Sequence, residues 1–204
     1  MSDDDIDIEN ASRRRILWIV LGLNVALAAA FGITGVTADS SALIANGLDN
    51  LSDSLVYMIT LLALGRPPVW KRGAARLSGI LLILFAAGVL FDVGRRFLTG
   101  TDPIGSSMMW MALVAAAVNA LCVWLLRRIR RPDVNIRAAN TFSSNDFVAN
   151  AGVLLGGALV AWTGRAWPDL AGGVAVAVIA CRGGLSSLRE AHRETDTHKQ
   201  RANG

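Results

Sequence analysis

Apolar residues recur along the chain in six stretches of about 20 residues, with short polar segments between them. A helix of about 20 apolar residues is long enough to cross a hydrocarbon core of ~30 Å. The predicted spans cover about residues 16–37, 41–65, 77–98, 108–126, 138–163 and 169–187. Because the connections are short, consecutive helices should be antiparallel neighbours. We therefore predict an all-α integral membrane protein, a six-transmembrane-helix bundle.

The composition agrees with this pattern. Of the 204 residues, 53% are hydrophobic and only 18% are charged, and the mean hydropathy is +0.44. A soluble domain of this length would carry more charge and would show a two-sided polar and apolar period. We expect a multi-pass protein of the cell (inner) membrane, with the lipid bilayer as its surroundings.

The basic residues are distributed unevenly between the two ends of the predicted bundle. Arginines and lysines gather before the first span, in the second and fourth connections and after the sixth span, whereas the first connection has none. Basic segments stay on the cytoplasmic side of a membrane, so both termini are predicted to be cytoplasmic. This sidedness accounts for the net charge of +4, and no nucleic-acid partner is expected.

The two ends of the chain are predicted to be short cytoplasmic tails. Residues 1–12 form an acidic tail that we expect to be solvated and disordered, and SDDDIDIEN lacks the basic region of a cleavable signal peptide. Residues 13–192 form the six-helix transmembrane domain. Residues 193–204 form a second, polar tail.

A few polar residues interrupt the apolar spans, and these are the informative minority. Asp49 and Asp53 are four residues apart, so they share one face of the second predicted helix. Asp146 and Asn150 have the same spacing in the fifth. Asp49 lies roughly 12 Å below the start of its span and Asp146 roughly 12 Å above the start of its own, so both approach the middle of the membrane. We predict that all three carboxylates point into one cavity between helices two and five.

Three carboxylates converging in a low-dielectric interior repel one another and need protons, a cation or both. A divalent cation competes with protons for the same oxygen atoms. A site of this kind that is exposed alternately to each side exchanges cations for protons. For the intramembrane asparagines, which include Asn24 and Asn119, simple hydrogen bonding between helices is an equally good interpretation. Cys122 and Cys181 are expected to be buried small apolar residues.

Two sequence stretches resemble the cation diffusion facilitator family of divalent metal transporters. SALIANGLDNLSDSL is similar to the family's second-helix signature, with Asp49 and Asp53 at its ligand positions, and NDFVANAGVLLGG is similar to the fifth-helix segment, with Asp146 at the family's aspartate. The arginine pair after span three, the WPD before span six and Arg182 add to a resemblance over about residues 13–192.

The resemblance implies export of a divalent metal cation, with zinc ranked first, then cobalt or cadmium, then manganese or iron. It also implies exchange with protons, a four-ligand site shared by helices two and five, and a homodimer. The family's fourth ligand lies four residues before the fifth-helix aspartate, and here that residue is Phe142, which cannot bind a metal. Asn145, Asn150, Ser143 or a water molecule are the candidate replacements. The family's frequent C-terminal cytoplasmic domain is not expected, so the chain resembles a short form.

Other classes of function have less support in the sequence. It contains no Ser–His pair, HExxH motif or intramembrane histidine, so we predict that the protein is not an enzyme and has no resident cofactor. The metal is expected as transported cargo. The alternative is a non-transporting membrane scaffold derived from such a transporter. In that case, Phe142 in place of a ligand would indicate that metal binding has been lost.

Overall fold

The computed structural model describes residues 3–63, 68–128 and 134–202, which form six helices and contain no strand. The helices are α1 (Asp3–Thr37), α2 (Ser41–Ala63), α3 (Pro68–Thr99), α4 (Gly105–Arg127), α5 (Val134–Thr163) and α6 (Trp167–Ala202). Each predicted span lies almost entirely within one of them. The predicted all-α bundle is therefore confirmed.

The helices differ from the predicted spans mainly at their polar ends. α1 begins at Asp3, so the prediction that the acidic N-terminal stretch is disordered is wrong. Acidic side chains in the first turn of a helix complement its dipole, which favours a helix that starts among aspartates. α6 likewise continues through the predicted polar tail to Ala202.

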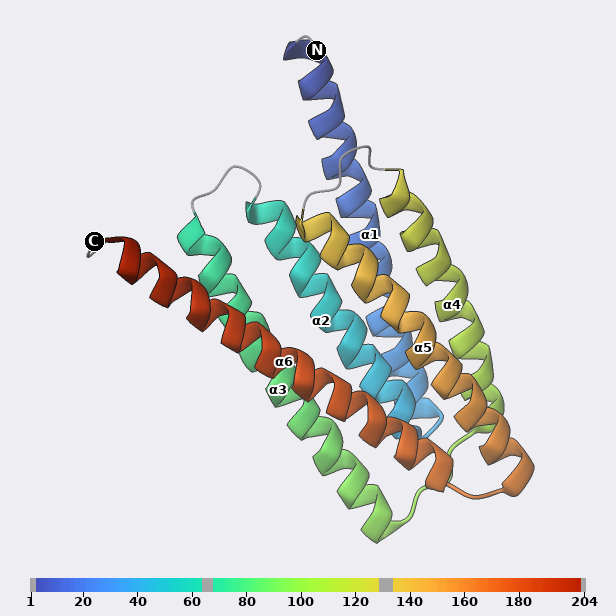
Figure 1. Cartoon of the computed structure of the whole chain (residues 1–204). Coiled ribbons are helices and arrows are strands. Elements are labelled where there is room, and N and C mark those ends of the chain that lie inside the picture. The colour runs from blue at the N-terminus through green and yellow to red at the C-terminus, as the bar shows by residue number, and fades with distance from the viewer. Residues whose placement is uncertain (1–2, 64–67, 129–133, 203–204) are drawn as a thin grey trace.

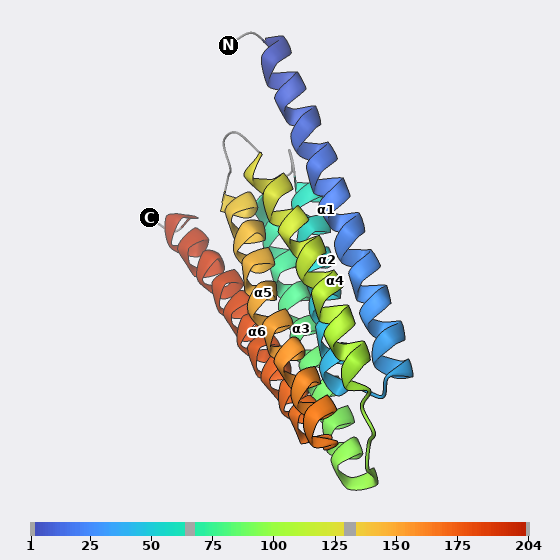
Figure 2. The ribbon, with the colours of Figure 1, turned by 90° about the vertical axis from the view of Figure 1, so that its right-hand side faces the viewer.

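The helices pack as three preferred pairs: α1 with α2, α4 with α5, and α3 with α6. α2 also contacts α3, α5 and α6, and α1 contacts α4, so α1, α2, α4 and α5 form one bundle with the α3–α6 pair beside α2 (Figure 1, Figure 2). The short connections at residues 38–40, 100–104 and 164–166 lie together at one end, called here the short-loop end. Both termini lie toward the opposite, terminal end (Figure 1).

Two apolar clusters fill the four-helix bundle at different levels. The first lies toward the short-loop end and includes Phe31, Leu43, Met108 and Val160. The second lies toward the terminal end and includes Leu17, Tyr57, Cys122 and Leu126. A third apolar cluster, built from α2, α3 and α6, attaches the α3–α6 pair.

Glycines permit close approach in two of the helix pairs. A Cβ atom on Gly105 of α4 would lie 2.4 Å from the carbonyl oxygen of Gly157 on α5. A Cβ atom on Gly184 of α6 would lie 2.8 Å from the carbonyl oxygen of Gly79 on α3. Any side chain at these positions would push the backbones apart, so small residues set the packing of these helices.

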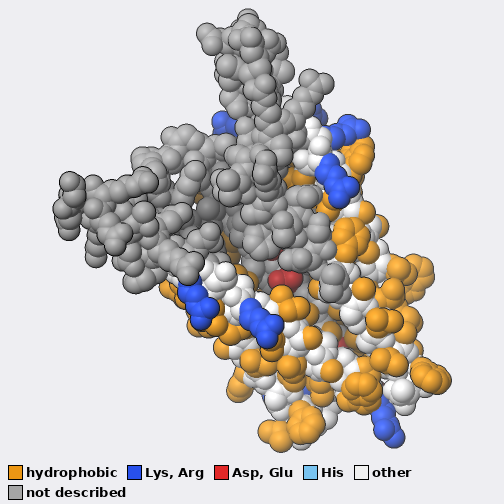
Figure 3. Space-filling model, in the orientation of Figure 1, with side chains coloured by type: hydrophobic (Ala, Val, Ile, Leu, Met, Phe, Trp, Pro, Cys, Tyr) orange, Lys and Arg blue, Asp and Glu red, His pale blue; other side chains and the backbone are white. Residues whose placement is uncertain are grey.

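The surface of the bundle suits a lipid environment. Three helical segments within the described residues are long and apolar enough to cross a membrane, namely Arg14–Thr37, Gly105–Arg127 and Trp167–Ser186. Large apolar side chains such as Phe91, Trp110 and Trp162 are exposed, and Figure 3 shows hydrophobic side chains over much of the described surface on one face. The protein is therefore a membrane protein with an all-α bundle.

Candidate metal centre

Two buried carboxylates, one from α2 and one from α5, lie close enough for their charges to interact. Asp53 and Asp146 are each 6% exposed, and the charge of Asp146 acts on the carboxyl group of Asp53. The Oδ2 atom of each residue is buried without a hydrogen-bond partner. Since burial removes the water that would solvate these oxygens, each is suited to bind a cation or a proton.

Asp49, the third carboxylate of the predicted site, occupies a different setting. It is half-buried and lines a small cavity together with Ala45 of α2, Phe85 of α3 and Val176 of α6. This cavity lies between α2, α3 and α6. The sequence had predicted that Asp49 would face a cavity between helices two and five. Residues four apart differ by about 40° around a helix, which lets the Asp49 side chain lie against a different neighbouring helix.

The charges of the three carboxylates are nevertheless coupled, because Asp49 acts on both Asp53 and Asp146. Within the part of the chain that the structure describes, no group of three or more His, Cys, Asp or Glu side chains could hold a metal ion together. The structure thus brings Asp53 and Asp146 into one buried region and places Asp49 beside it. A complete metal site would need further donors.

The structure describes the side chain of one of the two predicted amide ligands. Asn150 is buried on α5, one turn from Asp146, and its Nδ2 atom has no partner. The side chains of Asn145, Phe142 and Ser143 lie outside the described residues. Of these candidate replacement ligands, the structure therefore describes the side chain of Asn150 alone, buried on α5 one turn from Asp146.

Asp53, Asp146 and Asn150 belong to a larger set of buried polar side chains in the four-helix bundle, which we call the polar layer. Its members are Asn24 of α1, Asn50 and Asp53 of α2, Asn119 of α4, and Asp146 and Asn150 of α5. Along α1, α2 and α4, these residues lie between the members of the first and second apolar clusters. The polar layer is therefore enclosed by apolar packing toward both ends of the bundle.

The side-chain N–H groups of Asn24 and Asn50 do not bond between helices, the interpretation that the sequence allowed for the intramembrane asparagines. The Nδ2 atom of Asn24 donates to the carbonyl oxygen of Val20, at 3.0 Å, and that of Asn50 donates to the carbonyl oxygen of Asn46, at 2.9 Å. Both bonds stay within one helix. The Oδ1 atoms of Asn24 and Asn50 are buried and have no partner.

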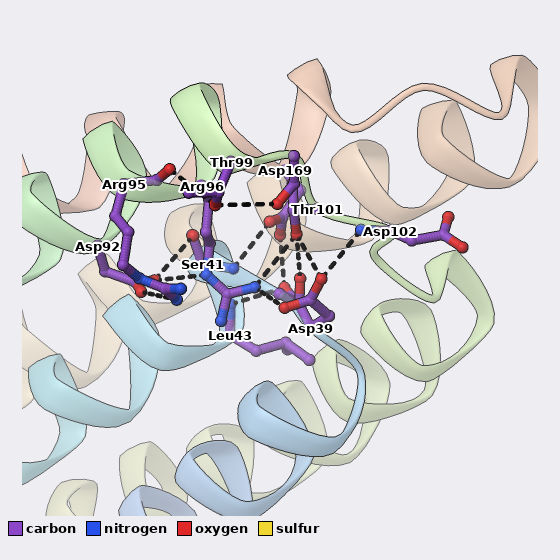
Figure 4. A network of polar contacts seen from close by, with 12 residues as sticks. Asp39, Ser41, Leu43, Asp92, Arg95, Arg96, Thr99, Thr101, Asp102 and Asp169 are labelled. Carbon is purple, nitrogen blue, oxygen red and sulfur yellow. Dashed lines mark hydrogen bonds and ion pairs between the residues drawn. The ribbon is translucent and has the colours of Figure 1, made fainter.

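A second polar assembly lies at the short-loop end and is built around Arg96 of α3 (Figure 4). Arg96 is only 5% exposed. Its Nε atom bonds Asp92 at 2.7 Å, and its guanidinium also pairs with Asp39, in the connection between α1 and α2. Asp92 also pairs with Arg95, at 2.9 Å. This assembly joins the outer turns of α1, α2 and α3.

Asp39 has a left-handed backbone, with φ of 51°, and its side chain is held from several sides. Partial burial raises its pKa, but the backbone N–H of Asp102 and the hydroxyl of Thr101, together with Arg96, outweigh this effect and lower the pKa overall. The N–H of Asp102 and the hydroxyl of Thr101 donate to Oδ2 at 3.0 and 2.7 Å. Asp39 therefore stays ionised and fixes the connection before α4 against the one before α2.

Asp169, at the start of α6, caps the beginning of α2. It is completely buried and accepts hydrogen bonds from the backbone N–H groups of Ser41 at 2.8 Å and Ala42 at 3.1 Å. The hydroxyl of Ser40 also donates to it. The first N–H groups of a helix have no partner within that helix, so a carboxylate from α6 satisfies them here.

A family model of the cation efflux transmembrane domain matches residues 17–194 of the chain. The chain belongs to this family. The finding confirms the resemblance that SALIANGLDNLSDSL and NDFVANAGVLLGG indicate.

Curated relatives of this cation efflux domain are bacterial metal transport proteins. The chain is 26% identical over 172 residues to a cadmium, cobalt and zinc/H(+)-K(+) antiporter of Bacillus velezensis, an alignment that covers 78% of the chain and 55% of the relative. It is 25% identical over 199 residues to the zinc transporter ZitB of Escherichia coli, covering 91% of the chain and 63% of the relative. It is 26% identical over 169 residues to the metal cation efflux system protein CzcD of Cupriavidus metallidurans, covering 77% and 54%. The chain thus spans between about half and two thirds of the length of these relatives.

Sequence reasoning missed the role of Asp169 in this cation efflux domain. Its contact with Ser41 joins residues 128 positions apart, and no local pattern reports such a contact. The available signal was an aspartate placed at the start of an apolar span. Asn24 and Asn119 were recognised as intramembrane polar residues, but their lack of partners could only be seen in the folded chain.

Proposed function

We propose that this cation efflux domain exports a divalent metal cation in exchange for protons, through a site built on Asp49, Asp53 and Asp146. The observation that carries the proposal is the pair Asp53 and Asp146, buried on two packed helices with an unpartnered carboxylate oxygen each. The protein is a transporter rather than an enzyme. The metal is its cargo, and it needs no resident cofactor.

The chemistry of the carboxylate pair supports exchange. Two carboxylates whose charges interact in a buried region cannot both stay ionised without a compensating positive charge. A divalent cation can supply that charge, and protons can supply it in its place. Since metal ligands must be deprotonated to bind, loading of metal and loading of protons exclude each other.

Zinc is the first candidate for the cargo, followed by cobalt or cadmium and then manganese or iron. The names of the relatives support this order, because they include zinc, cadmium and cobalt. The donor set is made of oxygen atoms, which also suits the harder manganese ion. Asn150 is one candidate for the ligand that Phe142 cannot supply, with Asn145 as another.

The distribution of charge supports an orientation with both termini in the cytoplasm. Arg14, Arg15 and Arg127 lie toward the terminal end, at the boundaries of the apolar segments of α1 and α4. At the short-loop end, Arg95 and Arg96 are neutralised by Asp92 and Asp39. With this orientation, the domain would reside in the inner membrane and export metal toward the short-loop end. We also propose a homodimer, as the family resemblance implies.

Transport by purified protein in liposomes that contain a zinc-sensitive dye tests the proposal. A pH gradient is imposed, and wild type is compared with Asp53→Asn, which keeps the size of the side chain and removes its charge. Asp102→Asn is the matched control, because this carboxylate is exposed at the short-loop end. We expect zinc flux that follows the proton gradient in wild type and the control and is absent in Asp53→Asn.

The same liposomes decide between the transporter and the scaffold. If wild type moves no zinc, then cobalt, cadmium, manganese and iron(II) are tried in turn. Silence for every one of these metals refutes transport and leaves the scaffold. Flux that persists in Asp53→Asn leaves transport standing and refutes this site.

A further inference from the structure

Asn119 of α4 is the member of the polar layer in which both side-chain polar atoms are buried without a partner. It is 0% exposed, and both Oδ1 and Nδ2 are buried without a hydrogen-bond partner. A buried amide destabilises a fold unless its polar atoms are bound. Asn119 therefore needs a partner that the surrounding protein atoms do not provide.

The unpartnered atoms of the polar layer are unbalanced between acceptors and donors. The acceptors are one carboxylate or amide oxygen each of Asn24, Asn50, Asp53, Asn119 and Asp146, and the donors are the Nδ2 atoms of Asn119 and Asn150. The two donor groups lie on α4 and α5, the helices of only two of the five acceptors, and their four N–H hydrogens are too few for all five. An excess of oxygen acceptors is the arrangement that binds a cation together with its water molecules.

The position of α4 brings Asn119 toward the carboxylates. Cys122 follows Asn119 by three residues, so the two side chains lie on the same face of α4. The charges of Asp146 and Asp53 both act on the buried thiol of Cys122, which places this face of α4 toward the carboxylate pair. α4 also packs along α5, the helix that carries Asp146.

We propose that Asn119 provides a cation ligand from α4, through Oδ1 directly or through one water molecule, to a divalent cation held by Asp53 and Asp146. Asn119 then supplies the fourth ligand, which Phe142 cannot provide. The Oδ1 atoms of Asn24 and Asn50 accept hydrogen bonds from the remaining water molecules of the cation. The binding site is consequently shared by four helices, and its ligand is a partly hydrated divalent cation. This inference rests on the proposed function, because it places a ligand at the same carboxylates.

Equilibrium binding of Zn²⁺ to the purified full-length chain in detergent tests the role of Asn119 without a transport assay. Four proteins are titrated beside wild type, and thermal unfolding of each metal-free protein is recorded. Asp53→Asn identifies the part of the signal that belongs to the carboxylate site. Asn119→Leu removes both polar atoms at similar size, Asn119→Asp adds a charge to the same shape, and Thr34→Val is the control for loss of a polar group elsewhere in the bundle.

We expect Asn119→Leu to weaken Zn²⁺ binding at the Asp53-dependent site by about 10- to 100-fold, the range found when groups that support a metal site are removed. Asn119→Asp should tighten binding at least about tenfold, since a full charge then meets the divalent cation in a low dielectric. Thr34→Val should bind as wild type does. The metal-free Asn119→Leu protein should be no less stable than wild type, because it lacks the unpartnered amide.

Two results overturn the inference while leaving the proposed function intact. One is a Zn²⁺ affinity within twofold of wild type for both Asn119 variants, when Asp53→Asn has lost the site. The other is a loss of metal-free stability in Asn119→Leu with unchanged affinity, which would make the amide a packing element. If Asn119→Leu does not fold, Asn119→Asp decides alone, and unchanged or weaker binding in it refutes the ligand. If wild type shows no Asp53-dependent binding at all, the proposed carboxylate site itself fails, and this inference falls with it.

Discussion

Replacing Asp169 by alanine removes the carboxylate with which α6 caps the first turn of α2. The variant leaves the backbone N–H groups of Ser41 and Ala42 in a fully buried place without an acceptor. A buried donor that loses its partner costs about 1–3 kcal/mol, so two such donors cost about 2–6 kcal/mol. Loss of a capping side chain measured alone is about 0.5–2 kcal/mol, which points to the lower half of that range. We expect a loss of about 3 kcal/mol.

Thermal unfolding of detergent-purified protein measures this loss. For a chain of this size, 1 kcal/mol shifts Tm by about 2–4 °C, so Asp169→Ala should lower Tm by about 6–12 °C. Asp169→Asn keeps one carbonyl acceptor and should show about half the shift. Asp102→Ala removes an exposed carboxylate at the same end and should leave Tm within about 1 °C, as for most surface substitutions.

Hydrogen exchange adds a local measurement to the global one. In wild type, the N–H groups of Ser41 and Ala42 are bonded to Asp169, and that of Leu43 donates to the hydroxyl of Ser40 at 3.1 Å. In Asp169→Ala, faster exchange should be confined to this first turn of α2. A Tm equal to that of Asp102→Ala, with unchanged exchange at Ser41 and Ala42, would refute the reasoning.

Two further predictions concern the short-loop end and the α4–α5 contact. Because the pKa of Asp39 is lowered from its ordinary value of 3.8, its ionised form stabilises the fold above that pH, and this stabilisation is lost as the pH falls through the lowered pKa. Asp39→Asn should therefore unfold at a lower temperature than wild type at pH 7, and the two melting temperatures should converge as the pH falls below 3.8 and through the lowered pKa; a difference that stays constant as the pH is lowered would contradict the assignment. Gly105→Ala should destabilise the protein in the same melting assay, since its Cβ would lie 2.4 Å from the carbonyl oxygen of Gly157, whereas Gly88→Ala, with nothing within 4 Å, should raise stability by up to about 1 kcal/mol. Equal melting temperatures for the two alanine variants would show that the α4–α5 contact can relax.

The helices could be predicted from the sequence because the length of an apolar run is a local property. All six predicted spans lie almost entirely within helices. The ends of α1 and α6 could not be predicted, since the signal of a span stops where the polar residues begin, although the helix continues to Asp3 and Ala202. The length of an apolar run predicts the part of a helix that spans the membrane, and it says little about the part that continues into water.

The depth of the site residues within the membrane could be predicted from the sequence, but the direction in which their side chains point could not. The depths of Asp49 and Asp146 in their spans predicted one buried region for these two residues and Asp53, and the structure places Asp53 and Asp146 there. Which neighbour Asp49 faces depends on how α2 is rotated against α3 and α6, which no spacing along one helix reveals. The partners of Asn119 depend on α1, α2 and α5 together, so their absence could only be found after the helices were packed.

The two apolar clusters that enclose the polar layer have a consequence for leakage. A cation or proton in the polar layer is separated from one side of the membrane by Phe31, Leu43 and Met108 and from the other by Leu17, Tyr57 and Leu126. Moving one charge across a membrane at 100 mV is worth about 2.3 kcal/mol, so an exchanger with a continuous wet passage would dissipate the gradient that drives it. In the proposed exchange, these two apolar clusters would insulate the cation site on both sides, and turnover would require them to open in alternation. Their side chains, rather than the carboxylates, would then set how tightly metal export is coupled to proton entry.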